Sequence, residues 1–86
     1  MTENEKYHNM LLANFDKIHT TKLGVDRIKK NLNINLDVVI YIKNKIKDKN
    51  CYVYKKGKNY YCEIDEIVIT INSYNYSIIT AKKVKE

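Results

Sequence analysis

The sequence predicts an α+β fold in which two to three N-terminal helices pack on one face of a four-stranded antiparallel meander sheet. Up to Asp48, apolar residues recur at spacings of three and four, as on the buried side of a helix. From Cys51 onward they alternate with polar residues, and turn signals divide this half into four short segments. Helices followed by strands, rather than alternating with them, are typical of a two-layer α+β domain.

The chain length suits one domain, which we expect to span residues 1–86. At 86 residues, a single core buries about 60 to 65% of the surface of the unfolded chain. There is no proline, and no linker or repeat is visible. The longest apolar run, Val38 to Ile42, is far shorter than the roughly 20 residues of a membrane span. With an acidic, polar N-terminus unlike a signal peptide, we expect a cytoplasmic protein without membrane contact.

A first helix is predicted from about residue 4 to residue 19. Thr2 and Glu5 have the spacing of a capping box, in which each side chain bonds the other residue's backbone N–H. His19 would then lie in the last turn of this helix. The apolar residues that follow at helical spacing are Tyr7, Met10, Leu11, Phe15 and Ile18.

A second helix is predicted over about residues 21–32 and a third over about 36–48. Thr20 or Thr21 can cap the second, which carries Leu23, Val25, Ile28 and Leu32 on its apolar side. Asn35 or Asp37 can start the third. Its run from Val38 to Ile42 is β-branched and could form a strand instead, but the spacing of Val39, Ile42 and Ile46, with Leu36 and Tyr41 nearby, favours a helix.

Four strands are predicted over about residues 51–55, 58–64, 67–72 and 75–82. Lys56-Gly57 is the first expected turn, because glycine readily adopts the positive φ of a tight hairpin. Asp65-Glu66 and Ser73-Tyr74 are the second and third. These turns would pair Lys55 with Lys58, Val53 with Tyr60, Cys51 with Cys62, Ile64 with Ile67, Cys62 with Ile69, Thr70 with Ser77 and Val68 with Ile79.

Alternate residues of a strand point to opposite faces, so this register assigns every side chain to a face. The face expected to meet the helices carries Cys51, Val53, Tyr60, Cys62, Ile64, Ile67, Ile69, Ile71, Tyr76 and Ile78. The opposite face is expected to carry Tyr52, Tyr54, Tyr61, Glu63, Val68, Thr70, Asn72, Ser77, Ile79 and Ala81.

Three tyrosines on the open face suggest a binding surface. Aromatic side chains on an exposed sheet stack bases in several RNA-binding folds. Tyrosine is also a good strand former, and cross-strand tyrosine pairs stabilise a sheet without any ligand. The residues expected to stack are Tyr52, Tyr54 and Tyr61.

The charge of +6 favours RNA, another nucleic acid or an acidic protein surface as partner; a second copy of the chain is a further candidate. Scattered lysines that are simply solvated are the alternative interpretation. The candidate phosphate contacts are Lys29, Lys30, Lys56, Lys58, Lys82 and Lys83.

Neither a metal nor a cofactor is expected. Cys51 and Cys62 are the two cysteines, and a cytoplasmic compartment would keep them reduced as small buried side chains. A zinc site would need two further ligands. His8 and His19 lie in the helical half without ligand spacing.

The sequence favours a protein without enzymatic activity, but a ribonuclease stays open. Such an enzyme needs an acid or base and a cation for phosphoryl charge. The candidates are His19, Arg27 and Glu63. Each also has an ordinary structural interpretation, as a helix-terminal histidine, a solvated arginine and a strand glutamate.

Several blocks resemble a family of small bacterial proteins with a domain of unknown function: His19 to Leu32, Lys56 to Tyr60, Ile69 to Tyr74 and Ile78 to Ala81. The resemblance implies no activity. A histidine often follows the Thr-Ala pair in that family, where this chain has Lys82, so a reaction that needs this histidine would be absent here. The order of helices and strands is also similar to toxin ribonucleases of the RelE and barnase type, by topology alone.

Three functions are therefore carried forward, in order of preference. The first is RNA binding through the tyrosines and lysines. The second is a protein-interaction module, such as a phage or mobile-element inhibitor of a host system. The third is a toxin-like ribonuclease.

Overall fold

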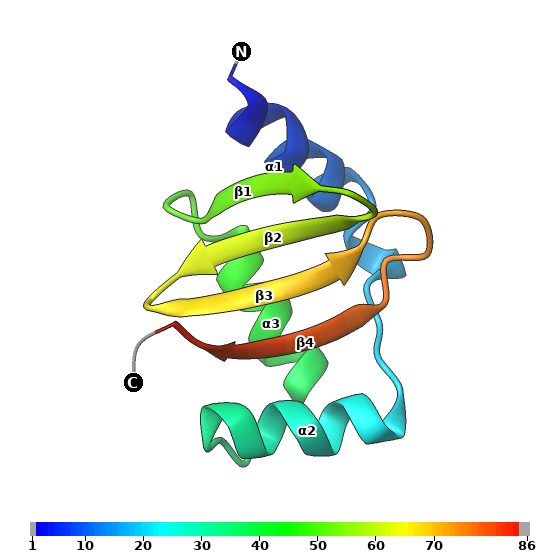
Figure 1. The fold of residues 1–86 in the computed structure, drawn as a ribbon, viewed down its shortest axis with the longest axis vertical. Helices are drawn as coiled ribbons and strands as arrows, with labels where there is room; N and C mark the ends of the chain where they lie inside the picture. The colour runs from blue at the N-terminus through cyan, green and yellow to red at the C-terminus, as the bar shows by residue number, and fades with distance from the viewer. Residues whose placement is uncertain (1, 85–86) are drawn as a thin grey trace.

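The computed structural model describes residues 2–84, and it confirms the predicted fold class: three helices precede a four-stranded antiparallel sheet in the order β1-β2-β3-β4. Helix α3 lies behind the sheet, α1 runs beside β1 and α2 runs beside β4 (Figure 1). The elements are α1 (Glu3–Ala13), the short 3-10 helix η1 (Phe15–Lys17), α2 (Lys22–Leu32), α3 (Val38–Lys47), β1 (Tyr52–Lys56), β2 (Asn59–Ile64), β3 (Ile67–Asn72) and β4 (Ile78–Lys83).

Each α-helix begins at a side chain that accepts a hydrogen bond from the first turn. Thr2 and Glu5 form the expected capping box at α1. Thr21 caps α2 by accepting from the Gly24 N–H, and Asp37 caps α3 by accepting from the Ile40 N–H. These caps satisfy backbone donors that have no partner within the helix. The β-branched run from Val38 is therefore helical, as the spacing of its apolar residues predicted.

The first helix is shorter than predicted because the chain leaves the helical path at Asn14. The Asn14 side chain donates to the carbonyl of Met10 at 2.9 Å, and the Asn14 backbone N–H donates to the same carbonyl at 3.2 Å. After η1 the chain is extended at Ile18 (φ −68°, ψ 127°). The sequence predicted His19 in the last turn of this helix. His19 lies outside the helix instead and pairs with Ser77 in a parallel bridge.

The first hairpin turns at Gly57-Lys58, one position later than predicted. Lys56 now opposes Asn59, and Val53 opposes Cys62 instead of Tyr60. The pairing has slipped by two residues, which changes partners but leaves every side chain on its predicted face. Gly57 has a φ of +62°, as the tight turn requires.

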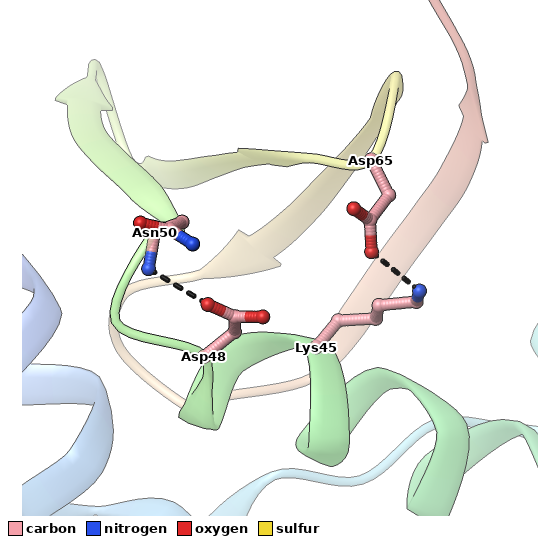
Figure 2. A network of polar contacts seen from close by, with 4 residues as sticks. All are labelled: Lys45, Asp48, Asn50 and Asp65. Atoms are coloured by element: carbon pink, nitrogen blue, oxygen red, sulfur yellow. Dashed lines mark hydrogen bonds and ion pairs between the residues drawn. The ribbon is translucent and has the colours of Figure 1, made fainter.

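The second hairpin has the predicted register, with Ile64 opposite Ile67. Its two turn residues are not glycines, yet Asp65 and Glu66 have φ values of 53° and 64°. The Asp65 carboxylate pairs with the Lys45 ammonium at 2.6 Å, which ties this turn to α3 (Figure 2). The Lys45 pKa is raised, chiefly by that hydrogen bond.

The third connection differs from the predicted tight turn. Asn72 accepts two backbone N–H groups of the loop, those of Tyr74 and Asn75, with its side-chain oxygen. β4 therefore starts at Ile78, and the pairing shifts between Ile71, opposite Ile78, and Thr70, opposite Thr80.

This shift is a β-bulge, and it changes the predicted faces of β4. Ile79 is the extra residue, so positions after it point to the opposite face from the one expected. Ala81, predicted on the open face, is fully buried opposite Ile69. Thr80 and Lys82 are instead on the open face, opposite Thr70 and Val68.

The core lies between the helices and the predicted apolar face of the sheet. Three residues predicted on buried helix sides are exposed instead: Met10, Leu23 and Leu36. At the start of α3, Val38 is buried together with Ile42 and Ile46, whereas Val39, predicted on that side, is only half-buried. The core comprises Leu11, Ile18, Ile28, Leu32, Val38, Ile42, Ile46, Cys51, Val53, Tyr60, Cys62, Ile64, Ile67, Ile69, Ile71, Tyr76, Ile78 and Ala81.

Both edges of the sheet are engaged by the helical half. At β1, the Val53 N–H donates to the Asn4 side chain at 2.6 Å. At β4, the His19 carbonyl accepts from the Ile78 N–H at 2.7 Å, and the Thr20 hydroxyl donates to the Ile78 carbonyl at 3.0 Å. Unpaired edge groups would otherwise invite pairing with another chain.

The two cysteines are free, fully buried thiols. They do not oppose each other as predicted, because Cys62 faces Val53 and Cys51 precedes β1. Their side chains are nevertheless neighbours: a hydrogen bond with Cys51, together with burial, raises the pKa of Cys62. The Cys62 thiol therefore stays protonated and unreactive at neutral pH.

The two tight turns give a paired stability prediction. Gly57→Ala is expected to destabilise by about 1 kcal/mol, because an added Cβ meets no atom but the positive φ disfavours it. Glu66→Gly is expected to stabilise by about 0.5 to 1 kcal/mol, because it relieves the same conformation. Urea denaturation at constant m-value measures both changes, and equal signs would contradict the argument.

Gly24 gives a second stability prediction, based on close packing. A Cβ there would clash with the Thr20 hydroxyl that bonds Ile78. Gly24→Ala should therefore destabilise, although alanine is the better helix former by about 1 kcal/mol.

In a Thr20→Ala background the same Gly24→Ala change should destabilise much less, because the clash with the Thr20 hydroxyl is gone and only a tight contact of 3.3 Å with the Thr21 hydroxyl remains. A double-mutant cycle by urea denaturation measures this difference. Destabilisation of similar size in both backgrounds would contradict it.

Candidate functional site

One face of the sheet carries no helix, and it is the face seen in front in Figure 1. We call it the open face. The register arranges its side chains in rows across the strands. One row contains Tyr52, Glu63, Val68 and Lys82; the next contains Tyr54, Tyr61, Thr70 and Thr80; the third contains Lys56, Asn59 and Asn72.

Tyr52, Tyr54 and Tyr61 form a contiguous group on the open face, as predicted. The rings of Tyr54 and Tyr61 are stacked, with centroids 5.4 Å apart and an interplanar angle of 17°. Tyr52 lies 5.9 Å from Tyr54 at a tilted angle. Because Tyr52 is 53% exposed while the other two are half-buried, its ring offers the most surface to a ligand.

Glu63 belongs to the same group. The Tyr54 hydroxyl donates to the Glu63 carboxylate at 3.1 Å. Burial of the ring and this hydrogen bond raise the pKa of Tyr54. The bond holds both side chains in place, and it occupies the only carboxylate on the open face of the described strands.

Two threonines continue the middle row towards α2. Thr70 is almost completely buried although it lies on the open face. Beyond it, Thr80 accepts a long hydrogen bond of 3.4 Å from the Asn31 side chain of α2. The open face therefore ends at α2 on the β4 side.

The candidate lysines are distributed over several surfaces. Lys56 and Lys82 are on the open face, and Lys58 is in the first turn at its margin. Lys83 is opposite Ile67, so its side chain leaves β4 on the face that meets the helices. The two candidate lysines of α2 lie in its last turn, where positive charge complements the helix dipole: they are Lys29, which is half-buried, and Lys30, which is exposed.

Lysine–aromatic contacts are confined to the helical side within the described residues. The three contacts place Lys6 over Tyr7, Lys43 over Phe15 and Lys45 over Tyr41, each with the nitrogen 5.2 to 5.7 Å from the ring centroid. In the part of the chain described, no lysine covers an open-face tyrosine.

The structure does not bring His19 and Glu63 together. His19 pairs with Ser77, which precedes β4 and accepts a hydrogen bond from the Asn72 N–H at the end of β3, whereas Glu63 pairs with Val68. Val68 and Asn72 are four residues apart on β3, which separates the two ends of the sheet by about 13 Å. His19 also bonds the Lys17 carbonyl through Nδ1 at 2.8 Å. An acid–base pair of these two residues has no support from this geometry.

Sequence reasoning missed Thr80 and Asn31 as parts of the surface. Strict alternation after Ile78 would put Thr80 on the same face as Ile78, because a bulge leaves no clear mark in a run such as Ile78 to Thr80. Asn31 is near the end of the predicted second helix and was not among the candidate site residues. Its role depends on where α2 lies, which a single sequence does not specify.

Two further features concern residues 2–84. In this range, no helix is long and apolar enough to cross a membrane. Nor does any group of three or more His, Cys, Asp or Glu side chains in it have an arrangement that could hold a metal ion.

Comparison with known proteins identifies a family. Residues 12–82 match the family described as "Protein of unknown function (DUF3781)". No curated protein and no solved structure matches the chain, so the topological likeness to toxin ribonucleases stays a prediction. The matched segment runs from the last two residues of α1 almost to the end of β4, and thus includes all of the open face. The chain therefore belongs to the DUF3781 family of proteins of unknown function.

Proposed function

We propose that this protein binds single-stranded RNA through the open face. The observation that carries the proposal is the contiguous group of Tyr52, Tyr54 and Tyr61 on a sheet face without a helix. Unpaired bases stack on such rings, and each stack contributes about 1 to 3 kcal/mol to binding. Stacking is tolerant of sequence because every base has an aromatic face.

The charges around the face favour an anionic ligand. Lys56 and Lys82 lie on the face and Lys58 at its margin, all exposed to solvent. The carboxylate of Glu63 is engaged by Tyr54 and lies beside the rings rather than between the lysines. The net charge of +6 adds a long-range attraction for RNA, which salt screens.

The same rings also stabilise the sheet, and the test must separate the two roles. Tyr54 and Tyr61 stack on each other, so each has one ring face committed within the protein. Tyr52 has the larger exposed surface and no side-chain hydrogen bond in the described structure. Replacement of Tyr52 should therefore weaken the binding of a stacking ligand more than it lowers the stability of the fold.

The corresponding prediction uses fluorescence anisotropy with a labelled oligouridylate. Tyr52→Ala combined with Tyr61→Ala should weaken binding at least about tenfold, the equivalent of one lost stack. Tyr74→Ala is the matched control, because Tyr74 is 73% exposed but lies in the loop before β4, outside the open face. Its affinity should equal that of the wild type, and urea denaturation checks that all variants are folded.

Two outcomes would overturn the proposal. One is an unchanged affinity in the folded double variant. The other is the absence of salt-dependent binding by the wild type at low ionic strength. A protein that co-purifies after nuclease treatment, and is lost in Tyr52→Ala, would assign the face to a protein partner instead. Cleavage of the probe would support the ribonuclease hypothesis.

A further inference from the structure

One side of α2 borders the open face. The helix runs beside β4 (Figure 1), and its Asn31 side chain reaches the Thr80 hydroxyl in the middle row of that face. The helix is held in this place by the preceding segment, in which the Thr20 hydroxyl bonds the Ile78 carbonyl of β4. The side of α2 that carries Asn31 is therefore continuous with the sheet surface.

Arg27 lies on this side of α2. It precedes Asn31 by four residues, and residues at that spacing are neighbours on one helix face. Lys22, an exposed residue of the same helix, precedes Asn31 by nine residues, a rotation of roughly 180° about the helix axis, so it points away from the open face. The buried residues of α2 are Gly24, Ile28 and Leu32.

The guanidinium of Arg27 is available to a ligand. Arg27 is exposed, and the ion pair found in the described residues joins Lys45 to Asp65, far from α2 in the sequence. Asp26, the one carboxylate of α2, is rotated by about 100° from Arg27 and faces away from the sheet. Arg27 is also the only arginine of the chain, and its planar group binds phosphate oxygens in pairs.

We infer that the binding surface continues across β3 and β4 onto α2, where Arg27 binds a phosphate of the RNA. This inference rests on the proposed function. The strand then crosses the sheet along the middle row, from Tyr54 and Tyr61 over the two threonines to Arg27. The distance from β2 to β4 is about 10 Å, so the phosphate at Arg27 belongs to a different nucleotide from the stacked base.

The experiment compares two charge deletions on one helix. Arg27→Ala and Lys22→Ala each remove one positive charge from an exposed side chain of α2, but only Arg27 borders the open face. Anisotropy titrations with an oligouridylate of about ten nucleotides, over a series of salt concentrations, give the affinity and its salt slope. Arg27→Ala should reduce the slope by about 0.7, the value for one phosphate on a single strand, whereas Lys22→Ala should leave it nearly unchanged.

The same slope gives the expected change in affinity. A difference of about 0.7 in slope is a factor of about five for each tenfold change in salt. Between 1 M and about 0.1 M salt, the affinity of the wild type should therefore rise about five times more than that of Arg27→Ala. A dinucleotide probe, too short to reach from the tyrosines to α2, should bind Arg27→Ala and the wild type equally. Arg27→Lys should restore part of the affinity, because the charge remains and the paired hydrogen bonds are lost.

The possible failures are distinguishable. If the tyrosine variant loses RNA binding while Arg27→Ala and Lys22→Ala have equal effects, the path across the sheet is wrong and the proposed function stands. If Arg27→Ala weakens the dinucleotide as much as the longer probe, the arginine acts through its general field rather than by a phosphate contact, and the inference is also wrong. If wild type binds neither probe, both proposals fail.

Discussion

The arrangement depends on the hydrogen bonds that the chain makes with the edge of β4 as it passes from α1 to α2. The His19 backbone bonds Tyr76 and Ile78, and the Thr20 side chain bonds Ile78 again. These bonds require an extended chain, which explains why the first helix ends before this segment. They also fix where α2 begins, and Gly24 permits the close approach of the helix to Thr20. Without them, α2 would have no defined position beside the sheet.

The faces of the first three strands could be predicted because they change only when the register shifts by an odd number of residues. The first hairpin slipped by two residues, from Lys55 opposite Lys58 to Lys56 opposite Asn59. A shift of two changes every pair of neighbours and no face. The tyrosine group therefore survived an error in register. The bulge at Ile79 adds one residue to β4, so the residues after it exchange faces. Ala81 is therefore buried, and Thr80 lies on the open face.

The helices show a different limit of sequence reasoning. Their existence and their caps followed from local chemistry, namely Thr2 with Glu5, Thr21 and Asp37. Their buried sides were less predictable, because helices of 10 or 11 residues make only about three turns. An apolar residue at the margin of such a helix can face either way, and Leu23 is 73% exposed. The position of Arg27 beside the open face depends on the same rotation of α2, which becomes known only when Asn31 meets Thr80.

A chain of this size has material for one helical layer, so one face of its sheet is left to water. That face must be stable without a cover and must not promote aggregation. Tyrosines satisfy both requirements, because their rings pack against each other while their hydroxyls bond water or Glu63. Such packing alone would favour rings covered as fully as possible. Tyr52 is instead half exposed at the end of the group, on the edge strand β1. A lysine or a threonine at this position would reduce solubility less. The exposed ring of Tyr52 is therefore free for the stacking that we propose, in addition to its packing against Tyr54.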